Sequence, residues 1–154
     1  MERVQRFIEE AKETFKSADH LTYMTYPMLR EPKLIYSIAE KLYVANSRIM
    51  DAILYHEHAQ KTISVVPVEF ETRFNLFKGE LTKKHKVSNE TIQMISDLYE
   101  LVQANRNCPI AFPKNESYNF YCNNSIKKTI TIELAKKYLN LTRQFIKQTE
   151  NTQK

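Results

Sequence analysis

Glycine is almost absent from this chain: its 154 residues include only Gly79, where average usage gives about ten. Loops that bind dinucleotides, and P-loops that bind nucleoside triphosphates, need several glycines, because their backbone approaches phosphate closely and adopts positive φ. The sequence therefore excludes both kinds of loop. We expect no cofactor.

Long apolar runs are missing as well. No stretch approaches the 18 consecutive apolar residues of a transmembrane helix, and the charged, amphipathic N-terminal stretch is unlike a secretory signal. We therefore expect a cytoplasmic protein with no membrane partner. Cys108 and Cys122 are then predicted to be reduced thiols, and two cysteines alone do not predict a metal site.

Apolar residues recur at helical spacing through most of the sequence, which predicts one all-α domain over residues 1–150, followed by a frayed end over 151–154. The first helix is expected to end at Tyr26, because the residue before a proline disfavours the helical region. The second, over residues 34–60, carries the longest and widest apolar stripe.

Proline, glycine and helix-capping residues predict where the remaining helices begin and end. Pro67 suits the first turn of a third helix, and Gly79 suits a left-handed cap near its C-terminus. Ser88 is expected to cap a fourth helix, and Thr129 or Thr131 to cap the last. Four or five helices with short connections fold most economically as an up-down bundle.

The helical pattern is interrupted in residues 110–124. Short apolar and aromatic segments there are separated by a Lys-Asn-Glu-Ser sequence typical of a turn. A small β-hairpin or an irregular insertion is expected in this region, and a second turn is expected at 123–125.

The excess positive charge lies in the last quarter of the chain. Residues 1–113 hold 15 Lys and Arg against 15 Asp and Glu, whereas residues 114–154 hold 8 against 3. A neutral body with a basic face is typical of a protein that binds a polyanion through one surface. We therefore expect a non-enzymatic protein that contacts RNA or a ribonucleoprotein. The predicted phosphate-binding residues are Lys83, Lys84, Lys86, Lys127, Lys128, Lys136, Lys137, Arg143 and Lys147, and the aromatic residues beside them that could stack on bases are Tyr118, Phe120 and Tyr121.

Other interpretations compete with this one. Lysines on an exposed helix face usually serve only solubility, and aromatic residues such as those near 120 are more often core side chains than surfaces that stack on bases. The wide stripe of helix 34–60 is a candidate surface for self-association or for another protein. His56 is interpreted as a hydrogen-bonded histidine at the end of the core, and Asp51 as a solvent-facing carboxylate.

The segment Leu42-Tyr43-Val44-Ala45-Asn46-Ser47-Arg48-Ile49, which follows an N-terminal helix and a turn, resembles the helical HEPN domains over residues 1–60. The resemblance implies a helical domain, and many members of that family are metal-independent ribonucleases with an Arg-x(4–6)-His motif. Seven residues separate Arg48 from His56 here, so that motif is absent. The resemblance therefore carries over no catalytic residue and implies a non-catalytic member, or a divergent nuclease that uses Arg48 and His56.

Overall fold

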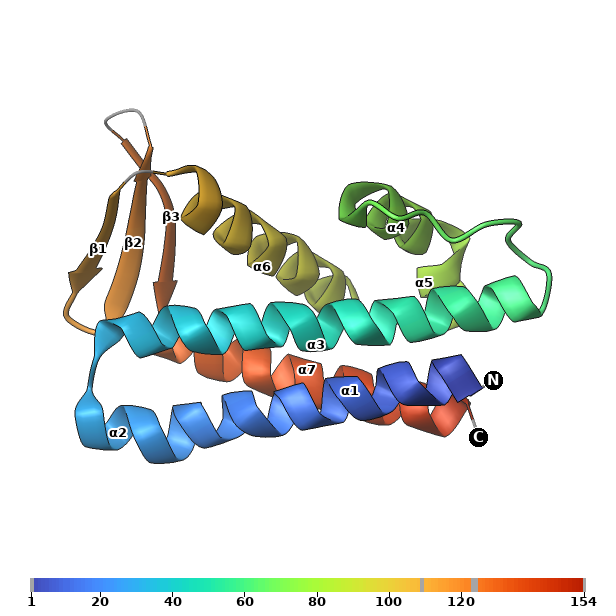
Figure 1. Cartoon of the computed structure of the whole chain (residues 1–154), viewed down its shortest axis with the longest axis horizontal. Helices are drawn as coiled ribbons and strands as arrows, with labels where there is room; N and C mark the ends of the chain where they lie inside the picture. Colours follow the sequence, from blue (N-terminus) through green and yellow to red (C-terminus); the bar gives the residue numbers. More distant parts are fainter. Residues whose placement is uncertain (1, 109, 123–124, 154) are drawn as a thin grey trace.

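Three long helices lie side by side in the computed structural model (Figure 1). α1 (Glu2–His20) packs along α3 (Pro32–Ala59), and α7 (Ile132–Thr152) packs against both. The two ends of the chain lie at the same end of the molecule. The structure describes residues 2–108, 110–122 and 125–153, and the side chains of all of these except 110, 122 and 125–127.

α3 is the central helix of the core. Its stripe, with Ile35, Leu42 and Ile49 among the fully buried residues, contacts α1, α7 and α6 (Asn89–Asn107). The predicted partner surface on helix 34–60 is therefore wrong, because this chain's own helices already cover that stripe. Within the described part of the chain, no helix has both the length and the apolarity needed to cross a bilayer.

The first helix does not end at Tyr26 as predicted. Tyr26 has helical φ and ψ of −60° and −45°, and its N–H donates to the carbonyl of Leu21, five residues back. This π-helical segment η1 (Leu21–Thr25) widens the helix before Pro27 and makes room for the proline ring. The short helix α2 (Tyr26–Leu29) therefore follows directly, and Arg30 ends it in the left-handed conformation.

The third predicted helix begins late and is bent. α4 (Phe70–Leu76) continues into the π-helical segment η2 (Phe77–Leu81) and the single turn α5 (Thr82–Lys84). Pro67 precedes the helix instead of lying in its first turn. Gly79 is not the left-handed cap, since its φ is −71° and it lies at the bend within η2; the left-handed residue after α5 is Lys86.

The later helix caps agree with the sequence. The side chain of Ser88 accepts a hydrogen bond from the Thr91 N–H at the start of α6. Thr131 does the same for the Leu134 N–H at the start of α7. α7 continues to Thr152, two residues beyond the expected end of the domain.

The insertion is a three-stranded antiparallel sheet, larger than the predicted hairpin. β1 (Ile110–Lys114) pairs with β2 (Ser117–Cys122), which pairs with β3 (Ser125–Thr131). The all-α prediction is thus confirmed as a mostly helical fold, with a sheet at the end opposite the chain termini (Figure 1). Residues 123–124 of the predicted second turn lie outside the described residues.

Two further side chains differ from expectation. Cys108, directly after α6, is disulfide-bonded, so the prediction of a reduced thiol is wrong for this residue. Asp51 was expected to face solvent, but it is buried, with 5% of its surface exposed. Its carboxylate forms ion pairs with Arg73 and Arg48, at 3.0 and 3.4 Å. Burial raises the pKa of Asp51, although both guanidinium groups oppose the shift.

Candidate nucleic-acid interface

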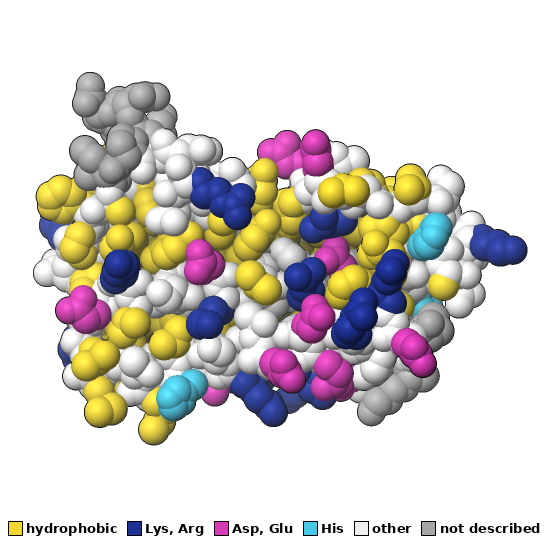
Figure 2. Space-filling model, in the orientation of Figure 1, with side chains coloured by type: hydrophobic (Ala, Val, Ile, Leu, Met, Phe, Trp, Pro, Cys, Tyr) yellow, Lys and Arg dark blue, Asp and Glu magenta, His cyan; other side chains and the backbone are white. Residues whose placement is uncertain are grey.

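The predicted basic residues occupy three separate elements. Lys83, Lys84 and Lys86 lie in and just after α5, and Lys136, Lys137, Arg143 and Lys147 lie on α7. Lys128 lies on β3; the side chain of Lys127 is outside the described part. Figure 2 shows basic and acidic side chains interspersed on the face that it presents. The predicted basic residues therefore do not form one surface.

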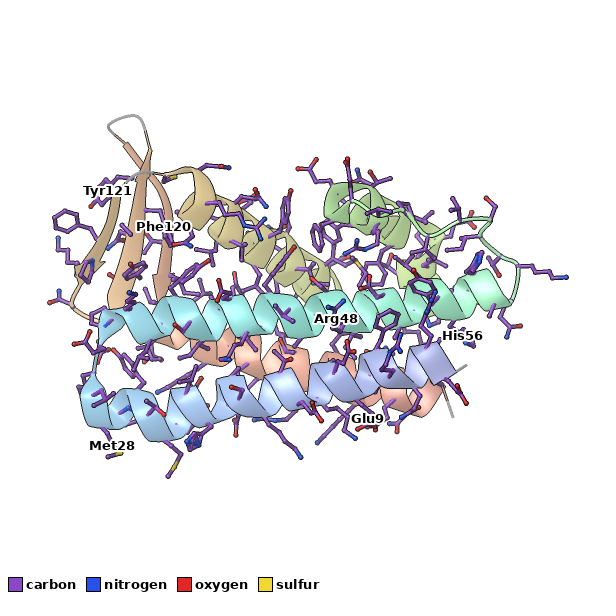
Figure 3. The ribbon with its side chains drawn as sticks, in the orientation of Figure 1. Glu9, Met28, Arg48, His56, Phe120 and Tyr121 are labelled. Carbon is purple, nitrogen blue, oxygen red and sulfur yellow. The ribbon has the colours of Figure 1, made fainter. Side chains whose placement is uncertain are left out.

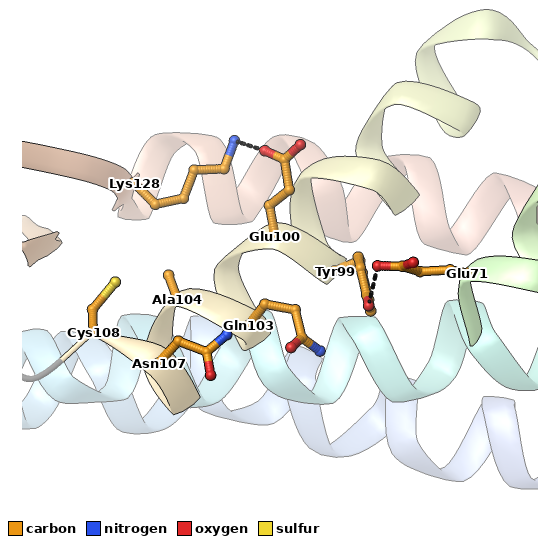
Figure 4. Close-up of a pocket in the computed structure, with 8 residues that line it drawn as sticks. All are labelled: Glu71, Tyr99, Glu100, Gln103, Ala104, Asn107, Cys108 and Lys128. Carbon is orange, nitrogen blue, oxygen red and sulfur yellow. Dashed lines mark hydrogen bonds and ion pairs between the residues drawn. The ribbon is translucent and has the colours of Figure 1, made fainter. Parts of the chain in front are cut away.

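Lys128 belongs to an acidic environment. Its ammonium lies 2.7 Å from Glu100 and 3.5 Å from Asp97, both on α6. Burial disfavours the charged form, but these carboxylates outweigh it and raise the pKa of Lys128. Lys128 and Glu100 line a pocket of about 460 Å³, and Glu71 lines it too (Figure 4). The Glu71 carboxylate accepts a hydrogen bond from the Tyr99 hydroxyl. A pocket with two carboxylates and one ammonium does not attract phosphate.

Lys84 is also paired, at the C-terminal end of α3. Its ammonium lies 2.8 Å from Glu57, and Nε2 of His85 lies 2.9 Å from the other oxygen of the same carboxylate. The Glu57 side chain has no exposed surface. Burial alone would raise the pKa of Glu57, but the contacts with Lys84 and His85 outweigh it and lower the pKa to about 2.

The low pKa of Glu57 predicts a loss of stability in acid. Because the folded-state pKa lies below the ordinary value of 4.5, ionised Glu57 contributes about 3 kcal/mol above pH 5, which is lost as the pH falls towards 2. Urea unfolding of the wild type and of Glu57→Gln should therefore differ by about this amount at pH 6 and converge near pH 2. A difference that does not change with pH would contradict this linkage.

The predicted stacking residues are mostly core side chains. Phe120 is 0% exposed and packs edge-on against Tyr36 of α3, with ring centroids 5.5 Å apart, so the prediction that it stacks on bases is wrong. Tyr118 is half-buried between Tyr36 and Phe120. Tyr121 is half-buried beside Phe112, at 5.9 Å. Tyr118 and Phe120 thus attach the sheet to α3, whereas Tyr121 packs within the sheet.

Three basic residues of α7 lie on its side towards α1 and η1: Lys136, Arg143 and Lys147. Arg143 lies 5.3 Å from the ring centroid of Phe15 and 3.3 Å from Asp19, both on α1. Further towards the sheet, the ammonium of Lys136 lies 5.9 Å from the Tyr23 ring. α7 therefore meets α1 through cations resting on aromatic rings, an arrangement that orders the cations but leaves their outer sides to solvent.

A groove between α1 and α7 has a volume of about 300 Å³ and an apolar floor of Phe15 and Ile146. Four cationic residues and one carboxylate complete its wall: Lys12, Lys16, Arg143, Lys147 and Glu150. Helical spacing produces this set, because residues four apart lie on one side of a helix, at 12 and 16 on α1 and at 143 and 147 on α7. We define these seven residues as the basic groove.

Two cations of the basic groove are available to a ligand. Lys12 is held by Glu150 at 2.8 Å, and the pKa of Lys12 is raised by this hydrogen bond and charge. Lys16 and Lys147 are exposed, and the described residues include no carboxylate within ion-pair distance of either. The net charge of the groove is thus positive. A phosphate could bind the ammonium groups of Lys16 and Lys147 without breaking an ion pair among the described residues.

Lys12 and Lys16 are not among the residues predicted from the sequence, because the positive and negative charges of residues 1–113 cancel when they are counted together. Their i, i+4 spacing on the first helix was the available signal.

A side chain of α7 also holds the loop after α5: Gln148 donates to the backbone carbonyls of His85 and Lys86 at 3.0 and 2.6 Å. This contact attaches the loop that carries Lys86 to the helix that carries Lys147.

The residues considered for catalysis do not form a common site. Arg48 is held by Glu10 and Asp51, at 3.1 and 3.4 Å, and lies about 12 Å along α3 from His56 (Figure 3). Nδ1 of His56 is buried and has no hydrogen-bond partner in the described part of the structure, so its interpretation as a hydrogen-bonded histidine is wrong for that nitrogen. The described residues also contain no cluster of metal-ligating side chains.

Comparison with known proteins gives no relative: no family model, curated protein or solved structure matches the chain. The HEPN resemblance therefore stays a prediction.

Proposed function

We propose that this protein is a non-enzymatic binding protein that holds the phosphate backbone of RNA, alone or in a ribonucleoprotein, in the basic groove between α1 and α7. The observation that carries the proposal is the convergence of Lys16 and Lys147, both without a described carboxylate partner, on one groove. Arg143 and Lys12 supply two further positive charges whose carboxylate partners compete with a ligand.

The spacing of these cations supports a polymeric anion over a single small one. Along each helix, residues four apart are separated by about 6 Å, so each side of the groove presents two cations in a row. A chain of phosphates can contact successive cations, and each contact releases counterions, which makes binding favourable at low salt. Lys136 and its Tyr23 ring extend the same side of α7 towards the sheet.

A salt titration tests the proposal. With three or four phosphates held, the affinity for a single-stranded RNA of about 20 nucleotides should fall roughly 15- to 60-fold between 50 and 200 mM salt, with a log–log slope of about −2 to −3. Fluorescence anisotropy of a labelled RNA measures this directly. Absence of binding at 50 mM salt, or an affinity that salt does not change, would refute phosphate recognition.

A further inference from the structure

The floor of the basic groove is apolar, although its walls carry cations. Phe15 of α1, which is half-buried, and Ile146 of α7 form this floor. Phosphate binds to lysine and arginine through charge and hydrogen bonds and makes no use of an apolar surface. A site that combines cations with an apolar floor instead suits a ligand that has both an anionic and an apolar part.

A planar cation lies over this floor. The guanidinium of Arg143 lies 5.3 Å from the ring centroid of Phe15, and 38% of the Arg143 side chain is exposed. Two hydrogen bonds hold it in place, one to Asn140 at 2.7 Å and one to Asp19 at 3.3 Å. Because the guanidinium is already ordered, it offers a flat surface to a ligand at little further cost in side-chain entropy.

A nucleotide of a single strand matches both parts of the groove. Its base is flat and stacks on aromatic rings and on arginine guanidinium groups, and its phosphates are anionic. The groove volume of about 300 Å³ is at the lower end for small-ligand sites, so it admits a group of the size of a base. Among the described residues, two apolar side chains line the groove, which is too little apolar surface to cover a lipid chain.

We infer, resting on the RNA binding proposed above, that the basic groove binds RNA as a single strand, with an unpaired base on its floor against Phe15 and Arg143 and with the neighbouring phosphates held by Lys16 and Lys147. In a duplex every base is paired and stacked, so its flat face is hidden and only the backbone reaches the cations. Because every base has a flat face, the groove should show little sequence preference.

Fluorescence anisotropy of the full chain at about 50 mM salt, with three labelled probes of equal length, tests this inference. The probes are a single-stranded RNA, the blunt RNA duplex of the same sequence, and a sugar-phosphate strand without bases. The single strand should bind about 5- to 100-fold more tightly than the strand without bases, the contribution expected from stacking one base. It should also bind at least about fivefold more tightly than the duplex, although the duplex carries more phosphates per length.

Phe15→Leu removes the aromatic ring and keeps the floor apolar. It should weaken binding of the single strand about fivefold and leave the affinity for the duplex and the log–log salt slope unchanged, because the phosphate contacts remain. Phe7→Leu is the matched control. Phe7 is also half-buried on α1 and also lies beside an arginine, with the Arg48 guanidinium 5.9 Å from its ring centroid, but it does not line the groove. Its variant should bind every probe like the wild type.

The outcomes distinguish base binding from phosphate binding. No binding of any probe would refute the proposed function, and the base site with it. If the duplex or the strand without bases binds as tightly as the single strand, phosphate recognition stands and the base site is refuted. An unchanged affinity of Phe15→Leu for the single strand, or an equal loss in Phe7→Leu, would also overturn the base site.

Discussion

Reversing the charges of Lys16 and Lys147 should weaken RNA binding about 100-fold at 50 mM salt and leave the fold intact. Both side chains are exposed, so Lys16→Glu/Lys147→Glu replaces two ammonium groups with carboxylates without disturbing the core. The groove would then hold more negative than positive charge and repel phosphate. The log–log salt slope should also become shallower by about 1.4, the contribution of two phosphate contacts.

The matched control is Lys33→Glu/Lys114→Glu. These two lysines are exposed too, at the start of α3 and at the end of β1, at the sheet end of the molecule (Figure 1). Both double variants change the net charge equally, so only the position of the charge differs. Equal losses of affinity in the two variants would show that overall charge, not the groove, attracts RNA, and an unchanged affinity of the groove variant would refute the site.

Phe120→Ala should lower the free energy of unfolding by about 3 to 5 kcal/mol, because truncating a fully buried aromatic ring leaves a cavity between β2 and α3. Urea unfolding followed by circular dichroism measures the loss. The affinity of the folded variant for RNA should stay unchanged, since Phe120 has no exposed surface with which to touch a base.

Phe112→Ala is the control for this substitution. Phe112 is 57% exposed on the neighbouring strand β1, so its truncation should cost less than about 1 kcal/mol. A small effect of Phe120→Ala together with weaker RNA binding would mean that the ring serves recognition. That result would restore the stacking role expected from the sequence.

Much of the helical architecture follows from local pattern. The stripe of α3 and the Ser88 cap of α6 required only residues within a turn or two of one another, and both agree with the structure. β3 was missed because Thr129 and Thr131 are both candidate helix caps, which predict the start of a helix, whereas pairing with β2 makes the segment up to Thr131 a strand. Such pairing depends on residues remote in sequence, so tertiary context overrides local preference.

The candidate site was also predicted only in part from the sequence. Charge counting identified Arg143 and Lys147 on the last helix, but it also included Lys84 and Lys128, which the fold neutralises with Glu57 and Glu100. Those ion pairs join residues 27 or 28 positions apart along the chain, so no local pattern reveals them.

The amphipathic helices, two of their caps and the basic character of α7 were determined by the sequence itself, because each depends on the spacing of neighbouring residues. Tertiary structure decided which cations remain available: it set Lys16 of α1 beside Lys147 of α7 and buried Glu57 under Lys84. The physical reason is that the electrostatic potential at a surface sums charges over space, while the chain orders them only along its length.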